Sequence, residues 1–376
     1  MSWIASGNTI IFEPYFNEEL DIELISDYTN LIFSNYALNK KLFKYYANNC
    51  FDNVRYEGSE FNQEVSELPS NITLINFGWA FNQDISNLPS TLIHLTLGYN
   101  FNQDVSMLPQ TLTYLVLGHN FNQDVSALPP TLTHLKFDYE FNQKISILPK
   151  NLKNLVFGEC FNQDVLNLPP TLTNLKFGCY FNQKVSRLPK KLKDLVFGDS
   201  FNQDISNLPS TLTHLTFGRN FNKPVSKLNC SLTHLTFGRN FNKDISKLPS
   251  SITHLTLGLK FTQQCVIPSN IKYLKLNCDN QYIINNLPNS IVELELDYHF
   301  SLQMDNLPTS IKKLIINKNS AYNMDLNCLP NFIEELQLNC CYKKRIMNIP
   351  KNLKKIIYDF NYPYKDDFAM LNVKIY

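Results

Sequence analysis

Five of the chain's seven histidines recur at one position of a repeating pattern, and they are the first candidates for chemistry. Imidazole can act as an acid or a base near neutral pH, and it is the commonest metal ligand in proteins. The five are His94, His134, His214, His234 and His254. No carboxylate or cysteine lies beside the last three within their own strand segments, so we do not expect a metal site.

Catalytic and cofactor sites are not expected either. Nine of the 11 glycines occupy a single slot of the repeat, from Gly78 to Gly258, and only Gly7 and Gly58 remain. Those two cannot build a phosphate-binding loop or a nucleophile elbow. The nine cysteines show no Cys-x-x-Cys spacing, and no slot groups His with Asp and Ser. The sequence therefore predicts a non-enzymatic protein without a metal or a cofactor.

Composition narrows the class of protein further. The 376 residues include 34 basic and 33 acidic side chains, a net charge of +1, which argues against a nucleic-acid binder or a polybasic membrane anchor. No apolar run reaches the roughly 18 residues that a membrane span needs, and no secretory signal follows Met1. We therefore expect a cytoplasmic protein with reduced thiols.

The elements that carry the histidines follow from a 20-residue repeat. Phe-Asn recurs from Phe61 to Phe241, and Leu-Pro recurs in the same lattice from Leu68 onward. Counting the Leu-Pro slots gives 15 units, with Asn229 in the one slot that lacks proline. A proline in almost every period excludes a long helix, because each would cost about 3 kcal/mol inside one.

The segment after each proline predicts a short strand. In the unit that begins at Phe101, the pattern is Leu112-x-x-Leu115-x-Leu117, followed by Gly118 to turn the chain. A 20-residue period with one strand can close only as a solenoid coil, whose apolar face is buried by the neighbouring coils. We expect the Phe of each unit to point inward in a ladder, and the Asn beside it to form a second ladder that satisfies backbone groups at the bend.

The pattern from Leu92 to Asn100 resembles a short leucine-rich repeat. With the recurring Phe-Asn and Leu-Pro steps, residues 61–358 resemble the FNIP-repeat proteins of amoebae and of the large DNA viruses that infect them. The resemblance implies a mainly β, leucine-rich-repeat-like solenoid of about 15 coils of about 20 residues, with a short parallel sheet. It also implies that an F-box can precede the repeats, and that a viral member would act in the host cytoplasm.

Three regions are expected from the limits of the repeat: an N-terminal segment 1–52, the solenoid 53–358 and a C-terminal cap 359–376. Between Glu18 and Asn49, the apolar spacing predicts two or three amphipathic helices, broken near Thr29 and Asn39. This small α-helical segment serves either as the cap of the solenoid or as a degenerate F-box, since Phe16 to Leu20 is similar to the start of that motif.

The slot between two buried leucines should face outward from the sheet. It places His94, Tyr114, His134, His214, His234 and His254 on one surface, and Arg219 and Arg239 follow the strand in successive coils. We interpret this surface as the binding site of a protein partner with an acidic segment, which makes the chain an interaction scaffold. Two alternatives stand: a solvated face whose residues were copied with the repeat, and a substrate adaptor that recruits a ubiquitin-ligase core through its N-terminus.

Overall fold

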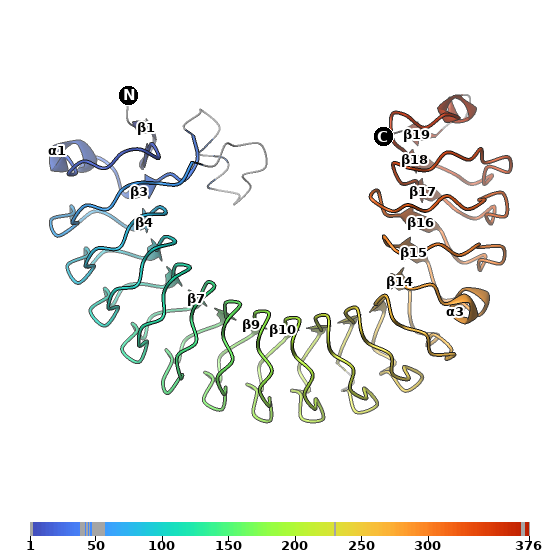
Figure 1. Cartoon of the computed structure of the whole chain (residues 1–376), viewed down its shortest axis with the longest axis horizontal. Helices are drawn as coiled ribbons and strands as arrows, with labels where there is room; N and C mark the ends of the chain where they lie inside the picture. The colour runs from blue at the N-terminus through green and yellow to red at the C-terminus, as the bar shows by residue number, and fades with distance from the viewer. Residues whose placement is uncertain are drawn as a thin grey trace. The chain divides into compact units, whose positions relative to one another are not determined.

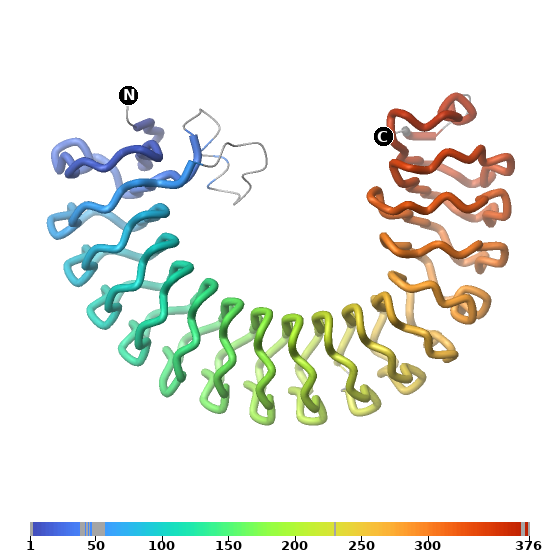
Figure 2. The backbone as a smooth tube through the Cα atoms, in the orientation of Figure 1, coloured from blue at the N-terminus to red at the C-terminus, as the bar shows by residue number. Residues whose placement is uncertain are grey.

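The computed structural model describes residues 3–37, 42, 44, 46, 57–228, 231–369 and 373–375. The chain divides into two compact units: residues 1–183 with 187–192, and residues 184–186 with 193–376. Each unit is a succession of coils of similar shape (Figure 2). Within each unit the strands lie side by side along the inner edge of the curve, and irregular segments form the outer edge (Figure 1).

The strands of the first unit are short, and from β2 onward they run parallel. The antiparallel pair β1–β2 starts the unit, and β2 to β9 then pair in sequence order. Their bounds are β1 Trp3–Ser6, β2 Thr9–Phe12, β3 Asn30–Phe33, β4 Leu74–Asn76, β5 His94–Thr96, β6 Tyr114–Val116, β7 His134–Lys136, β8 Asn154–Val156 and β9 Asn174–Lys176. A four-residue helix, α1, spans Ile22–Ile25 between β2 and β3.

The second unit repeats this arrangement with parallel pairing throughout. Its strands are β10 Asp194–Val196, β11 His214–Thr216, β12 His234–Thr236, β13 His254–Leu257, β14 Tyr273–Leu276, β15 Glu293–Leu296, β16 Lys313–Ile316, β17 Glu335–Gln337, β18 Lys355–Ile357 and β19 Lys374–Ile375. Helix α3 (Gln281–Asn285) replaces the irregular outer segment of one coil, and a 3₁₀ helix spans Lys365–Phe368.

Stacked phenylalanines fill the interior of both units, which confirms the predicted Phe ladder. Every ladder Phe from Phe61 to Phe261 is fully buried. Phe161 lies face to face with Phe157 of its own coil at a ring-centroid separation of 3.9 Å. It also stacks on Phe141 and Phe181 of the adjacent coils, each at 6.1 Å. The core is therefore continuous along a unit, and no single coil holds one of its own.

The asparagine beside each ladder Phe bonds backbone groups, as predicted, and these bonds link consecutive coils. In the first unit, the side-chain oxygen of each Asn from Asn62 to Asn162 accepts the backbone N–H of the next Asn at 2.8–3.0 Å. The same bonds join Asn202, Asn222, Asn242 and Thr262 in the second unit. The glutamine that follows adds a bond to the previous coil, as from Gln83 Nε2 to the Asn62 carbonyl at 2.9 Å. This ladder satisfies backbone donors where the chain leaves the strand side.

The recurring glycine was expected to turn the chain, but the structure gives it a different role. Among the described glycines, only Gly7 and Gly58 have a positive φ, so the repeat glycine does not serve to reverse the chain. Instead, a Cβ built on Gly98 would lie 1.6 Å from the carbonyl oxygen of Gly78, and one on Gly118 would lie 1.6 Å from that of Gly98. The backbones of neighbouring coils touch at this corner, so a Cβ added to these glycines would collide with the preceding coil.

Of the two or three helices expected between Glu18 and Asn49, one corresponds to α1, but the expectation is wrong at Asn30–Phe33, which form strand β3. β2 and β3 continue the parallel sheet, and Ile10 and Leu31 extend the inward column of Ile75. Counting from β2 to β18 gives 17 coils in place of about 15. Short apolar runs of this kind fit a helix or a buried strand equally well by spacing, and here the neighbouring strands decide. The helix expected near 39–49 lies largely outside the described residues.

At the C-terminal end, the segment beyond the last repeat adds a further strand. β19 pairs in parallel with β18. Phe368 is buried in the 3₁₀ helix, where its ring lies 6.0 Å from Tyr358 and 6.3 Å from Tyr362. Arg345 donates two hydrogen bonds to the carboxylate of Asp367, which ties this segment to the preceding coil.

Candidate functional site

From β4 to β18, the first and third residues of each strand point away from the core and form a surface that we call the strand face. Their side chains are exposed or half-buried, whereas the middle residue of every repeat strand is buried. Because consecutive strands pair in register, residues of one slot lie side by side about 4.8 Å apart. Six of the eight predicted site residues lie on the strand face, three in each unit.

In the first unit, the predicted residues form a loose row. The rings of His94 and Tyr114, and of Tyr114 and His134, are each 5.6 Å apart and tilted by 52° and 32°. His134 Nε2 lies 2.7 Å from Nδ2 of Asn154 in the next coil. Burial, followed by repulsion from His134, lowers the pKa of His94. These rings touch but do not form a regular stack.

In the second unit, four rings form a continuous stack that we call the histidine ladder. It consists of His214, His234, His254 and Tyr273. Their ring centroids are 4.2, 3.9 and 4.0 Å apart in that order, with interplanar angles of 15°, 17° and 8°. The in-register pairing of β11 to β14 imposes this spacing, because it places the four residues directly opposite one another. Tyr273 was not among the predicted site residues, since the repeat spacing slips by one residue just before it.

The threonine that precedes each ladder histidine contacts its ring and orients it. The Thr233 hydroxyl donates to the Thr213 carbonyl oxygen at 3.1 Å, and His234 Nδ1 lies 2.9 Å from the same hydroxyl oxygen. Thr213 and Thr253 hold His214 and His254 in the same way. Each threonine hydroxyl therefore fixes the orientation of the following ring through its Nδ1 atom.

The surroundings of the ladder disfavour its protonation. Burial lowers the pKa of His234, and repulsion from His254 and His214 lowers it further. Burial also lowers the pKa of His254, against the opposing attraction of Glu293. Tightly stacked imidazoles cannot all be charged without mutual repulsion. The lowered pKa values of His234 and His254 keep these two rings mainly neutral at neutral pH.

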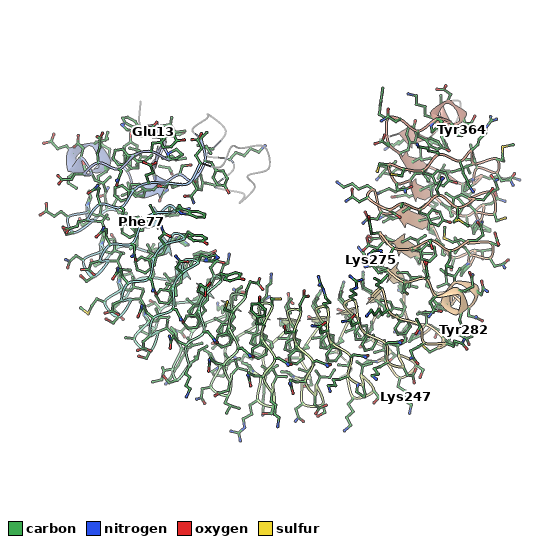
Figure 3. All side chains as sticks on the ribbon, in the orientation of Figure 1. Glu13, Phe77, Lys247, Lys275, Tyr282 and Tyr364 are labelled. Atoms are coloured by element: carbon green, nitrogen blue, oxygen red, sulfur yellow. The ribbon has the colours of Figure 1, made fainter. Side chains whose placement is uncertain are left out.

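Beyond the ladder the strand face becomes charged, and its charges are paired. Lys275 contacts Glu295 at 2.8 Å and Asp297 at 3.2 Å, and Lys313 contacts Glu293 at 3.2 Å. A shallow open depression of about 360 Å³ lies where the ladder meets these pairs, lined in part by His254, Tyr273 and Lys275. Figure 3 places Lys275 on the inner side of the second unit and Lys247 on its outer side.

The other two predicted residues, Arg219 and Arg239, lie off the strand face. Each follows its strand by three residues, in the turn at the edge of the sheet. Arg219 is exposed and its Nε lies 3.6 Å from Asp199, whose carboxylate also accepts the Arg219 backbone N–H at 3.0 Å. Its charge is thus already partly matched. The structure therefore separates the predicted set into a face group and an edge group.

A second aromatic stack lies in the same edge turns of the first unit and was not predicted. Trp79, Tyr99, His119 and Tyr139 stack in order with centroids 3.9, 4.0 and 4.7 Å apart. The slot after the repeat glycine reads Trp, Tyr, His and Tyr in successive coils, and this run is visible in the sequence. Cys340 and Cys341 share a turn, with their sulfur atoms 3.6 Å apart.

The described residues offer surfaces for contact and no grouped metal ligands. No three His, Cys, Asp or Glu side chains in the described ranges are placed to hold a metal ion. No helix in the described part of the chain is both long enough and apolar enough to cross a bilayer.

Stacked coils with one short parallel strand each, apolar ladders inside and a variable strand face define a leucine-rich-repeat-like solenoid, a class typical of interaction scaffolds. The chain belongs to the FNIP Repeat family, whose model matches eight segments of it. They are residues 61–100, 85–120, 101–140, 121–160, 141–180, 181–220, 221–260 and 261–299. No curated protein matches the chain.

Solved structures share the fold. The crystal structure of CroV588, described as a novel circular LRR protein, matches with a TM-score of 0.60 and 28% identity, over 95% of this chain and 67% of that one. The functional domain of InlJ from Listeria monocytogenes, which includes a cysteine ladder, matches with a TM-score of 0.52 and 13% identity. That match covers 93% of this chain and 72% of the InlJ domain, and at this identity it shows the fold alone.

Proposed function

We propose that the chain is a protein-interaction scaffold that binds a partner through the strand face of its second unit. The observation that carries the proposal is the histidine ladder. Four aromatic rings are locked in one stack by strand register, and the Nδ1 atoms of its three histidines are held by threonine hydroxyls. A rigid aromatic surface loses little side-chain entropy when a partner docks, which favours binding.

The partner's chemistry follows from how the ladder titrates. An acidic segment remains the proposed ligand, because Lys275 adjoins the ladder and each protonated imidazole adds a positive charge beside it. Since the pKa values of His234 and His254 are lowered, this attraction sets in below about pH 6.5, the ordinary value of histidine. The charged groups around the ladder include Glu293 and Glu295, which oppose the effect, and Lys313, which pairs with Glu293.

The adaptor alternative gains no support from the described N-terminus. An F-box is helical, whereas residues 3–37 contain three strands and one four-residue helix. Recruitment of a ubiquitin-ligase core therefore has no observation in its favour. A cytoplasmic location belongs to the scaffold proposal and is supported by the seven described cysteines, all of which are free thiols.

Immobilised protein and mass spectrometry of captured proteins test the scaffold proposal. The ladder variant replaces His214, His234 and His254 with Asn, the residue that Asn154 and Asn174 carry in the same slot, so the fold should be kept. The edge variant replaces Arg219 and Arg239 with Glu. Loss of the captured partner by the ladder variant alone supports the proposal. Capture of the same proteins in unchanged amounts by the ladder variant places the site elsewhere.

The acidic preference has its own test. A fluorescent polyglutamate peptide should bind the wild-type protein more tightly at about pH 5.5 than at about pH 7.5, two values on either side of the ordinary pKa of histidine. The ladder variant should bind the peptide with little difference between the two pH values. A wild-type affinity that does not change with pH would contradict the acidic ligand and leave the scaffold itself to the capture experiment.

A further inference from the structure

The near-zero net charge of the chain conceals a strong separation of charge along it. Residues 1–130 carry 14 acidic and four basic side chains, a net of −10. Residues 131–260 carry 17 basic and eight acidic side chains, a net of +9, and residues 261–376 carry 13 basic and 11 acidic. This separation creates strong local electrostatic fields, although the overall charge is only +1.

The negative charge of the first unit includes a regular column on the outer segments of four coils, which we call the acidic ladder. It consists of Glu64, Asp84, Asp104 and Asp124, one residue per coil and all exposed. The carboxylates of Asp84, Asp104 and Asp124 each accept bonds from the hydroxyl and backbone N–H of the serine two residues on. These bonds lower the pKa of Asp84 and Asp104, which keeps the column ionised.

The acidic ladder has no matching base of its own along the sequence. No Lys or Arg occurs between Arg55 and Lys136. Asp104 lies near enough to Asp84 to repel it. A row of like charges held at coil spacing is a surface that a positively charged partner stabilises.

The second unit carries a complementary column on the same part of its coils, which we call the basic ladder. Lys223 and Lys227 lie in one coil, and Lys243 and Lys247 lie in the next. Figure 3 places Lys247 on the outer side of the unit, away from the strands. Pro224 takes the slot that Asp occupies in the acidic ladder, so only Asp204 and Asp244 offset the four lysines in this column.

We propose that two copies of this chain associate by laying the acidic ladder of one copy against the basic ladder of the other. Both ladders repeat once per coil, so their charges have the same spacing and can pair along a row. Lysine and carboxylate pairs of this kind determine register and association rate. A second copy is favoured over another polyanion because it brings carboxylates at the pitch of the lysines, whereas an arbitrary polyanion does not.

The salt dependence of the molecular mass provides the first test. By light scattering at about 0.02 M salt, the mass of the full chain should rise with protein concentration. At about 0.5 M salt it should return to that of one copy, since screening then acts within a few ångström. A chain that stays monomeric at low salt and high concentration overturns the proposal.

Charge exchange provides the sharper test. The acid-reversed variant is Asp84→Lys, Asp104→Lys and Asp124→Lys, and the chain already carries Lys144 and Lys184 in this slot, so these changes should fold. The base-reversed variant is Lys223→Gln, Lys227→Glu, Lys243→Gln and Lys247→Glu. The unit that begins at Phe61 already has Gln63 and Glu67 in the two corresponding slots. Each variant alone should associate at least about tenfold more weakly than the wild type.

Mixing the two variants should restore association, because each then meets a ladder of opposite charge. A control variant, Lys136→Glu with Lys176→Glu, reverses two exposed lysines of the strand face and should associate like the wild type. Failure of the mixture to associate, or an equal loss in the control, overturns the proposal. Strong binding of heparin by a wild-type protein that stays monomeric also overturns it and assigns the basic ladder to an external polyanion. None of these outcomes depends on the histidine ladder.

Discussion

The imidazole of His234 lies parallel to that of His254, with ring centroids 3.9 Å apart and planes inclined by 17°. The Nδ1 atom of each ring is hydrogen-bonded to the hydroxyl of a threonine in the same coil. Contact at this distance ties the charge state of one ring to that of the other, because two cations stacked face to face repel strongly.

This stack predicts a loss of stability in acid. The pKa values of His234 and His254 are lowered in the fold, so the unfolded chain binds more protons below about pH 6.5. The free energy of unfolding should therefore fall as the pH drops from neutral through that value and the ladder is forced to charge. Urea unfolding at several pH values measures this pH dependence. The variant in which His214, His234 and His254 are replaced with Asn should lose the part of the pH dependence that the ladder causes. A variant with the same pH profile as the wild type would show that the stack is not responsible.

The phenylalanine ladder predicts a large cost for a cavity. Phe161→Ala should reduce the free energy of unfolding by about 3–5 kcal/mol, because the ring is fully buried and stacks on Phe157, Phe141 and Phe181. The break in the ladder should also split cooperative unfolding into two transitions in a urea titration. As the matched control, Phe157→Leu should cost under about 2 kcal/mol, since Leu97 and Leu117 occupy that slot in other coils.

The asparagine ladder predicts that the side-chain oxygen, and not the amide nitrogen, is what matters. Asn162 Oδ1 accepts the Asn182 backbone N–H at 2.9 Å and Gln183 Nε2 at 3.1 Å. Asn162→Ala leaves those donors without this acceptor and should cost about 1–2 kcal/mol. Asn162→Asp keeps both acceptor bonds and should cost less by thermal or urea unfolding. Equal losses in the two variants would mean that another property of the asparagine is needed.

The glycine corner predicts that one added methyl group is not tolerated. A Cβ on Gly118 would lie 1.6 Å from the Gly98 carbonyl oxygen, so Gly118→Ala must push two coils apart. We expect a loss of about 3 kcal/mol, at the upper end of overpacking effects. The control is Asp138→Ala, because Asp138 fills the same slot with a Cβ already present and should change stability little. Similar melting temperatures for wild type and Gly118→Ala would contradict the close approach of the coils.

The repeat made most of the architecture predictable. When one pattern recurs every 20 residues, each slot has one environment, so Phe161, Asn162 and the buried leucines could be assigned from spacing alone. The same logic placed His214, His234 and His254 on one outward surface before any geometry was known. It was weakest where the period fails, at the N-terminus, because Leu31 and its neighbours fit a helix or a strand until the adjacent strands are present.

What the sequence by itself determined was the coil: its strand, its inward residues and the column to which each outward residue belongs. Only the tertiary structure decided how neighbouring columns meet. Stacking of His254 on Tyr273, pairing of Arg219 with Asp199 and contact between the Gly78 and Gly98 backbones all join residues of different coils. These relations depend on rotamers, ring tilt and backbone separation, and the periodic pattern specifies none of the three, since it records which slot a residue fills but not the distance between slots.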